Sequence, residues 1–331
     1  MRFRRLKRRE FISLLGAAAW PGATRAQQGE PRRIGALMSI AENDPEGQSR
    51  VAAFEQRLRS LGWRNGDNIS VNYRWAASDP DRMRTYGAEL IAMKPELLLA
   101  NSPQVTAILK QQTQTLPIVF VQVADPIGSG IVPNLAKPGG NITGFASFQP
   151  EMGSKWLEIL KELAPRVTRV AVLLDPKFAG YVAISQVIEN VAPSFGVKPM
   201  VARIPDGADI EKAINEFARE PNGGLIVLPS PITAVKRETI VALAAQDRLP
   251  AIYPYRYFSV VGGLIAYALD SIDLYRRAAS YIDRIFKGEK PGNLPVQQPT
   301  KFELVINLAA ARAIGLEVPT RLLARADEII E

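Results

Sequence analysis

Residues 96–103, Glu-Leu-Leu-Leu-Ala-Asn-Ser-Pro, decide the fold class of this chain. The apolar run predicts a buried strand, and the Ser-Pro pair predicts a helix start, because serine caps helices and proline fits their first position. A strand that passes directly into a helix is the unit of a parallel α/β sheet. Residues 224–231, Gly-Leu-Ile-Val-Leu-Pro-Ser-Pro, repeat this strand and helix start.

Two further landmarks recur in the same order after each copy. A Leu-Pro pair opens the next strand at 116–117 and at 249–250, and a Gly-Gly pair precedes the last strand at 139–140 and at 262–263. Ordinary strand-helix chemistry could produce part of this agreement, but three landmarks in one order indicate related halves. The sequence therefore predicts an α/β fold with two similar Rossmann-like domains that contain parallel sheets.

The alternation of short β-branched segments and amphipathic segments places the individual elements. In the first half we predict strands at 34–38, 69–75, 96–100, 116–121 and 139–145, and helices at 49–61, 81–93 and 104–114. In the second half we predict strands at 169–174, 198–202, 224–228, 249–253 and 262–267, and helices at 181–194, 209–219 and 233–246. Trailing elements at 272–286, 301–306 and 308–315 cross back between the halves and would form a multi-strand hinge.

The N-terminal segment, residues 1–26, has the layout of an export signal peptide. Basic residues precede a short apolar run that ends in small residues, and no later segment is apolar enough to span a membrane. Arg8 and Arg9 precede Phe11 as in the twin-arginine motif, although an arginine-rich leader of the general secretory route has the same layout. No cysteine follows for a lipid anchor, so we expect a soluble periplasmic protein.

Charge and composition exclude several classes of function. Seven of the 41 Lys and Arg residues and one of the 33 acidic residues lie in the leader, so the rest of the chain has a net charge of about +2 and no basic stripe for nucleic acid. The chain contains no Cys and no His, which excludes the usual nucleophilic triads and thiolate or imidazole metal sites. Phosphate-loop and dinucleotide motifs are absent as well, so we predict no cofactor and no metal.

A ligand site is expected where the strands end, since ligands of open α/β sheets bind beyond the carboxyl ends of the strands. Two facing halves would form a cleft there. The predicted ligand-binding residues are Ser39, Asn101, Ser102, Asp125, Asp175, Tyr181, Ser230, Tyr253 and Tyr267. Four other residues also follow the ends of predicted strands, namely Asn43, Asp44, Phe178 and Tyr255.

Several of these residues have a structural alternative. Ser102 and Ser230 are also good helix caps, and Asp125 before Pro126 is typical of an Asx turn. Tyr181 and Tyr267 could equally belong to the core. Within the aromatic run from Tyr253 to Phe258 we favour Tyr253 as the ligand contact, and we expect its replacement by alanine to lower affinity more than stability.

Seven segments resemble the substrate-binding components of ABC transporters. They are residues 7–12, 23–28, 116–120, 125–126, 137–144, 262–264 and 287–323, and the most specific part is 294–304. The branch concerned includes tryptophan-binding TrpX-like proteins. The resemblance implies a type I periplasmic-binding fold with a three-stranded hinge. It also implies capture of a small solute and delivery to a membrane permease that a cytoplasmic ATPase drives. At Asn101-Ser102-Pro103 and at Asp175-Pro176 this chain differs from the residues common in the family. Both positions lie at the expected ligand site, so the resemblance does not imply that this chain binds an aromatic amino acid.

These expectations define the domains and the competing functions. The first ligand-binding domain comprises residues 32–147 plus about 268–296, and the second comprises 148–267 plus about 297–331. We predict a monomeric solute-binding protein of an ABC importer that captures a small polar or amino-acid-like solute and has no catalytic residues. A ligand sensor for a membrane receptor and an enzyme that uses carboxylates or tyrosine are the alternatives.

Overall fold

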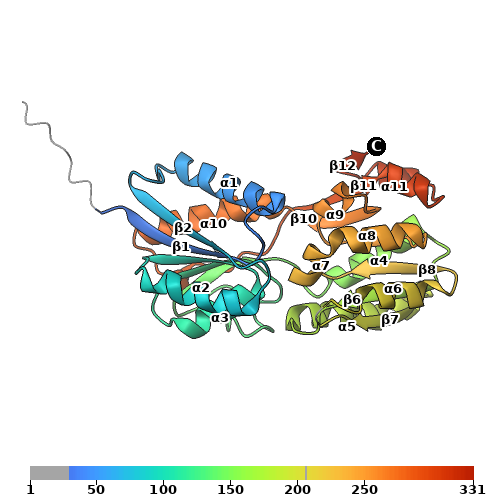
Figure 1. Cartoon of the computed structure of the whole chain (residues 1–331), viewed down its shortest axis with the longest axis horizontal. Coiled ribbons are helices and arrows are strands. Elements are labelled where there is room, and N and C mark those ends of the chain that lie inside the picture. The colour runs from blue at the N-terminus through green and yellow to red at the C-terminus, as the bar shows by residue number, and fades with distance from the viewer. Residues whose placement is uncertain (1–29, 206) are drawn as a thin grey trace, which may run out of the picture.

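The computed structural model describes residues 30–205 and 207–331 and contains two α/β lobes side by side (Figure 1). The predicted signal peptide, residues 1–26, lies outside the described residues. Among the helices of the described part, none has the length and apolar character needed to cross a membrane. Each lobe is built around its own sheet.

The first lobe contains a five-stranded parallel sheet in the order β2-β1-β3-β4-β5. The strands are β1 (Arg32–Met38), β2 (Ile69–Trp75), β3 (Leu97–Asn101), β4 (Ile118–Val123) and β5 (Ile142–Ala146), and the helices between them are α1 (Pro45–Ser60), α2 (Pro80–Ala92) and α3 (Pro103–Gln112). Every residue of β3, β4 and β5 is buried, which explains their largely apolar sequences.

The second lobe contains a seven-stranded sheet in the order β12-β11-β10-β9-β8-β6-β7. Its strands are β6 (Arg169–Leu174), β7 (Lys198–Arg203), β8 (Gly223–Val227), β9 (Ala251–Tyr253), β10 (Ile265–Leu269), β11 (Phe302–Asn307) and β12 (Glu328–Ile330). Strand β11 is antiparallel to β10. This sheet is therefore mixed, whereas the sequence predicted a parallel one. The reversal follows from topology, because β11 enters the sheet after the chain has returned from the first lobe.

The helices of the second lobe depart from the prediction in four places, one of which is an unpredicted short helix at Thr320–Leu323. The second-lobe helices are α4 (Met152–Leu163), α5 (Ala179–Val191), α6 (Ile210–Ala218), α7 (Pro231–Val235), α8 (Arg237–Gln246), α9 (Arg256–Val260), α11 (Leu308–Ala313) and α12 (Thr320–Leu323), with a short 3-10 turn η1 (Ala192–Phe195). A second 3-10 turn, η2 (Pro291–Asn293), packs against β5 of the first lobe. Helix α4 was not predicted, although Trp156, Leu160 and Leu163 form a helical apolar stripe. The helix predicted at 233–246 is divided at Lys236, and residues 256–260 form a short helix where no element was predicted.

The chain passes between the lobes three times. It crosses between β5 and α4, between β10 and helix α10 (Ser271–Phe286), and again before β11. Helix α10 follows the second lobe in sequence but packs against α1 and β4 of the first lobe. The crossings are linked by hydrogen bonds, from the Ala146 N–H to the Gln297 carbonyl at 2.8 Å and from the Asp270 N–H to the Lys301 carbonyl at 3.5 Å. The predicted multi-strand hinge is therefore present, while the exact domain boundaries stay a prediction.

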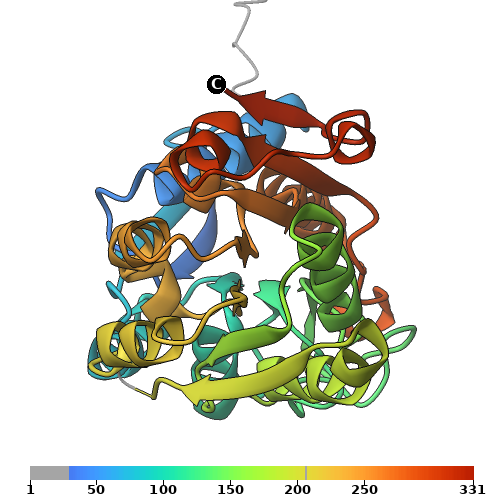
Figure 2. The same ribbon diagram turned by 90° about the vertical axis from the view of Figure 1, so that its right-hand side faces the viewer.

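The rotated view shows how the two lobes lie one in front of the other, with the carboxyl-terminal elements β11, α11 and β12 along one edge (Figure 2). Both sheets direct the carboxyl ends of their parallel strands toward the boundary between the lobes (Figure 1). Ser39 and Asn101, at the ends of β1 and β3, thus face Ser230, which follows β8. This arrangement places the strand ends of both lobes around one shared space.

Candidate functional site

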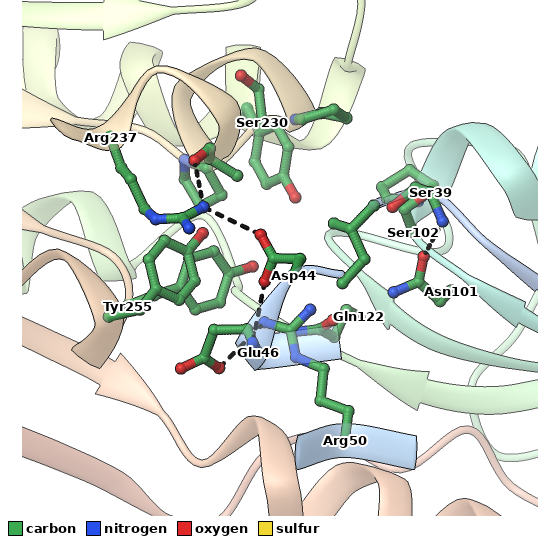
Figure 3. Close-up of a pocket in the computed structure, with 17 residues that line it drawn as sticks. Ser39, Asp44, Glu46, Arg50, Asn101, Ser102, Gln122, Ser230, Arg237 and Tyr255 are labelled. Atoms are coloured by element: carbon green, nitrogen blue, oxygen red, sulfur yellow. Dashed lines mark hydrogen bonds and ion pairs between the residues drawn. The ribbon is translucent and has the colours of Figure 1, made fainter. Parts of the chain in front are cut away.

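A cavity lies between the lobes, where strand ends and helix starts from both sheets converge (Figure 3). It is lined by Ser39, Ile40, Asp44, Glu46, Arg50, Asn101, Ser102, Pro103, Gln122, Tyr181, Pro229, Ser230, Pro231, Ala234, Arg237, Tyr255 and Tyr257. Its volume of about 60 Å³ is small beside the roughly 300–1,000 Å³ of common ligand pockets. A solute larger than a few waters therefore requires the lining side chains or the lobes to move.

Five of the nine predicted site residues line this cavity. Ser39, Asn101 and Ser102 come from the first lobe, and Tyr181 and Ser230 come from the second. Asp44 and Tyr255, which also follow strand ends in the sequence, line it as well. The structure thus brings together the groups that follow β1, β3, β6 and β8, although ligand contact by any of them stays a prediction.

In the first lobe the protein itself uses the polar groups at the ends of β1 and β3. The Asn101 Oδ1 accepts from the Ser39 N–H at 2.7 Å, and the Asn101 Nδ2 donates to the Tyr275 hydroxyl at 2.8 Å. Ser102 caps α3, since its Oγ accepts from the Val105 N–H at 3.4 Å. Asn101 therefore fixes the geometry of this wall, and Ser102 has the capping role that its sequence context suggested.

In the second lobe Ser230 forms a capping box at α7. Its Oγ accepts from the Thr233 N–H at 3.0 Å, and its own N–H donates to the Thr233 Oγ1 at 3.0 Å. Serine followed three residues later by a side-chain acceptor is the usual form of this motif. Capping leaves the Ser230 side chain at the cavity wall while it holds the start of the helix.

Tyrosine rings line the second-lobe side of the cavity. Tyr255 and Tyr257 are stacked with ring centroids 5.2 Å apart, and Tyr181 is buried nearby. Burial raises the pKa of Tyr255 to about 12 and the pKa of Tyr181 well above its usual value. These phenols are neutral at physiological pH, so they offer hydroxyl groups and ring faces rather than charge.

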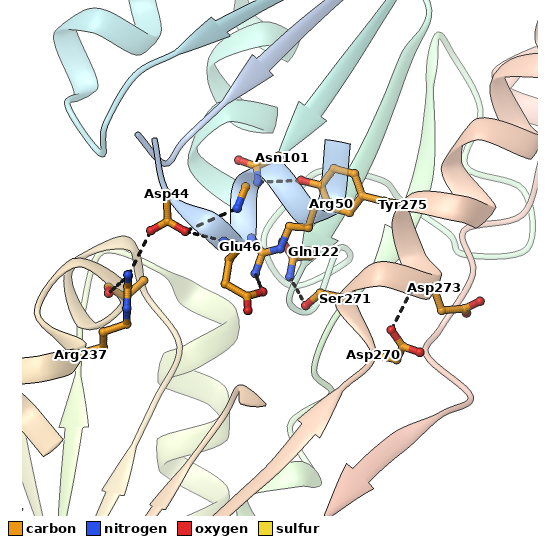
Figure 4. A network of polar contacts seen from close by, with 12 residues as sticks. Asp44, Glu46, Arg50, Asn101, Gln122, Arg237, Asp270, Ser271, Asp273 and Tyr275 are labelled. Atoms are coloured by element: carbon orange, nitrogen blue, oxygen red, sulfur yellow. Dashed lines mark hydrogen bonds and ion pairs between the residues drawn. The ribbon is translucent and has the colours of Figure 1, made fainter. Parts of the chain in front are cut away.

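Charged residues from both lobes meet in the lining of the cavity. The Arg237 Nη1 lies 3.1 Å from the Asp44 Oδ2, and this ion pair joins the start of α8 to the start of α1 (Figure 4). The other oxygen of Asp44 caps α1 by accepting from the Glu46 N–H at 2.9 Å. Arg237 also lies over the Tyr257 ring, 5.7 Å from its centroid. The pair therefore links the two lobes directly across the cavity.

Backbone packing brings the lobes close at a second point. Gly180, at the start of α5, approaches Ala124, which follows β4 in the first lobe, so that a Cβ at this glycine would lie 2.7 Å from the Ala124 carbonyl oxygen. Only glycine leaves room for that approach. The lobes are thus in contact at two points, at Arg237 with Asp44 and at Gly180 with Ala124.

Four predicted site residues lie outside the cavity lining. The Oδ1 of Asp125 accepts from the Gly128 N–H at 3.0 Å, which is the Asx turn that its sequence context allowed. Asp175 is buried and accepts from the Lys177 N–H at 3.1 Å, and desolvation raises its carboxyl pKa. Tyr253 is 1% exposed and stacks on Phe258 with centroids 4.9 Å apart. Tyr267 stacks on Phe302 at the β10–β11 pair.

Sequence reasoning missed the other polar residues of the site, namely Glu46, Arg50, Gln122 and Arg237. Two of them carried a signal. Gln122 interrupts the apolar strand at 118–123, and Arg50 occupies the helical position four residues before buried Phe54. A polar residue in an apolar stripe is uncommon unless it has a partner or a function.

Comparison with known proteins supports the resemblance. The sequence pattern of the family described as ABC transporter substrate binding protein matches residues 38–330. A tyrosine-binding protein of Clostridioides difficile is 23% identical over 270 residues, which are 80% of this chain and 76% of that protein.

Two solved structures share the fold. A conserved domain protein of Vibrio cholerae is 26% identical with a TM-score of 0.85, covering 91% of this chain and all of that one. The ABC domain of Streptococcus pneumoniae in complex with L-Trp is 22% identical with a TM-score of 0.84 and the same coverage.

The family match extends over nearly all of the described residues, from β1 to β12. It agrees with the predicted type I periplasmic-binding fold, which has two lobes, a triple crossing and a cavity between the strand ends. Members of the family bind solutes and are not enzymes. The chain therefore belongs to the ABC transporter substrate binding protein family.

Proposed function

We propose that this protein is the exported solute-binding component of an ABC importer. It captures a small polar or amino-acid-like solute in the cavity between the lobes and delivers it to a membrane permease driven by a cytoplasmic ATPase. One observation carries the proposal, which is that polar side chains from both lobes converge on one cavity beside three chain crossings. Such an arrangement allows two lobes to close around a ligand.

The relatives support the class of solute. The Clostridioides difficile relative is a tyrosine-binding protein, and the Streptococcus pneumoniae structure holds L-Trp. This chain lines its cavity with Tyr181, Tyr255 and Tyr257, together with two carboxylates and two guanidinium groups, so it offers ring faces and both signs of charge. These groups suit a small zwitterion or another polar solute.

The direct test is to identify the solute that the protein holds. Protein purified natively and then denatured should release one small molecule that mass spectrometry detects, and calorimetric titration of the emptied protein should return a single site. Binding should raise the melting temperature by mass action without consumption of the solute. Chemical turnover of the solute would contradict the proposal and favour an enzyme, and failure of a broad metabolite panel to bind would contradict solute capture.

Export to the periplasm is tested through the leader. If the twin-arginine route is used, replacing Arg8 and Arg9 together with lysine should retain the precursor in the cytoplasm, since the pair is the part of the address that the receptor recognises. Replacement of Arg4 and Arg5 with lysine is the matched control. Unchanged periplasmic protein after the first replacement would assign export to the general secretory route instead.

A further inference from the structure

Arg50 is a buried cation that faces the cavity. It lies on α1 in line with Phe54 and Leu58, on the side of the helix that packs into the first lobe, and it is only 5% exposed. Its guanidinium points into the space between Glu46 and Gln122 (Figure 3). A basic side chain on the buried stripe of a helix requires an acceptor, because burying an unpaired charge is costly.

The protein supplies that acceptor only in part. The nearest carboxylate oxygen, Glu46 Oε2, is 3.9 Å from Arg50 Nη2, which is beyond hydrogen-bond distance. The Arg50 Nε is buried and has no hydrogen-bond partner among the described residues. Asp44, the other acid of the cavity, is already held by Arg237 and by the start of α1.

The neighbouring tyrosines do not supply an anion either. Tyr255 and Tyr275 are buried, and desolvation raises the pKa of each phenol, so both stay neutral near pH 7. Tyr275 already accepts the hydrogen bond of Asn101 (Figure 4). Arg50, which lines the cavity, therefore keeps one buried donor, its Nε, without an acceptor in the described part of the chain.

We propose that Arg50 binds a carboxylate of the solute, which makes carboxylate-bearing small molecules the substrate class of this site. The guanidinium presents its donors as a planar fork that fits the two oxygens of a carboxylate. Helix α3 begins at the same cavity, and its N-terminal end adds positive partial charge. Tyr255 and Tyr257 line the second-lobe side and would contact the remainder of the solute. This inference rests on the proposed solute-binding function.

The first test compares each acid with its amide. The probes are L-tyrosine and L-tryptophan, the corresponding acids without the amino group, and the carboxamides of all four. We expect binding of acids and loss of binding for every carboxamide, and the acids without the amino group distinguish an amino acid site from a general carboxylate site. Equal affinity for an acid and its carboxamide would overturn the proposal. The solute released from native protein should also form a methyl ester, and a released solute without a carboxyl group would overturn it too.

The second test removes the guanidinium. Arg50→Met should weaken carboxylate binding by about 10- to 100-fold, the range for hydrogen bonds to charged groups, and Arg50→Lys should recover part of it. Arg59→Met is the matched control, since Arg59 lies on the same helix and pairs with Glu55 four residues before it, but is exposed. Arg50→Met binding an acid as tightly as the unaltered protein would overturn the proposal.

A stability measurement separates ligand binding from a structural role. Because an incompletely paired charge is buried at Arg50, the ligand-free Arg50→Met protein should melt at the same or a higher temperature than the unaltered one. A lower melting temperature with unchanged affinity would assign Arg50 to the fold. If the unaltered protein binds neither any probe nor a released solute, the proposed function itself fails, and this inference fails with it.

Discussion

At the cavity wall, side chains of similar polarity differ in whether the protein has already used their hydrogen-bonding groups. Asn101 is bonded on both sides of its amide, to Ser39 and to Tyr275, and Ser102 caps a helix. The Arg50 guanidinium, in contrast, has only Glu46 as a carboxylate neighbour at 3.9 Å, and its Nε has no hydrogen-bond partner among residues 30–205 and 207–331. Side chains whose hydrogen-bonding groups already have partners in the protein fix the shape of the site. Side chains with an unpaired donor or acceptor are available to bind a solute.

Burial changes the expectation for Tyr253. It is 1% exposed and stacked on Phe258, so Tyr253→Ala should leave a cavity in the core and lower the free energy of unfolding by about 3–5 kcal/mol. The Kd of the folded Tyr253→Ala protein for the solute should change little. Urea unfolding and calorimetry measure the two quantities. Tyr255→Ala is the matched replacement at the cavity, and it should lower affinity. A Tyr253→Ala protein of full stability and reduced affinity would restore the expectation from sequence.

The raised pKa of Tyr255 predicts how stability depends on alkaline pH. The folded protein favours the neutral phenol, whose pKa is about 12 against an ordinary value of 10.0, so its contribution is complete below pH 10 and is lost as pH rises from 10 to about 12. Tyr255→Phe should therefore flatten the fall of unfolding free energy over this range, by at most about 1.4 kcal/mol for each pH unit. Urea unfolding of both proteins from neutral to alkaline pH measures this. If the free energy of unfolding falls equally steeply with pH in both proteins, Tyr255 does not contribute to this pH dependence.

At the scale of elements, helices α1, α2 and α3 of the first lobe share one way of starting. Each begins with a capping side chain followed by proline, at Asp44-Pro45, Asp79-Pro80 and Ser102-Pro103. The cap satisfies a free N–H group, and proline supplies a backbone angle suited to the first turn. This local chemistry explains why helix starts agreed with the sequence to within a few residues.

Ser102 differs from the other caps because its backbone has φ +96°, a conformation that favours glycine. Ser102→Ala removes the cap and should lower the free energy of unfolding by about 1 kcal/mol or more, whereas Ser102→Gly relieves the strain and should change it by less than about 0.5 kcal/mol. Ser230 is the control, since it is also a cap but has extended backbone at φ −163°, so glycine brings no relief there. Urea unfolding of the alanine and glycine variants at Ser102 and at Ser230 measures these changes in the free energy of unfolding. A Ser102→Gly protein no more stable than Ser102→Ala would contradict the argument.

At the scale of the whole molecule, the lobes touch at two points, through Arg237 with Asp44 and through Gly180 with Ala124. The cavity of about 60 Å³ is consistent with lobes held close together. Entry of a solute therefore requires these contacts to open, and the three crossings are where the chain can bend.

The ion pair predicts how the lobes respond to its removal. Arg237→Met should shift the ligand-free protein toward separated lobes and speed solute release by about tenfold or more, as expected for a charged hydrogen bond. Small-angle scattering should show a larger radius of gyration, and stopped-flow measurement should show the faster release. Arg256→Met is the control, because Arg256 pairs with Glu328 inside the second lobe. Scattering and release rates equal to those of the unaltered protein would show that the pair does not hold the lobes together.

The sequence by itself determined the α/β class, the two similar halves, nearly every strand, and the helix caps at Ser102 and Ser230. These features depend on neighbours within a few residues, where periodicity and capping act. It also indicated the cavity at the strand ends, because parallel strands place those ends on one side of each sheet.

Only the tertiary structure decided which strand-end residues share the cavity. Tyr253 and Tyr267 have the same local pattern as Tyr255, yet they pack against Phe258 and Phe302 instead. Arg50 and Arg237, more than 180 residues apart in the chain, line one space because the chain crosses between the lobes three times. Local patterns do not contain such long-range contacts, and those contacts set the charge and burial on which binding depends.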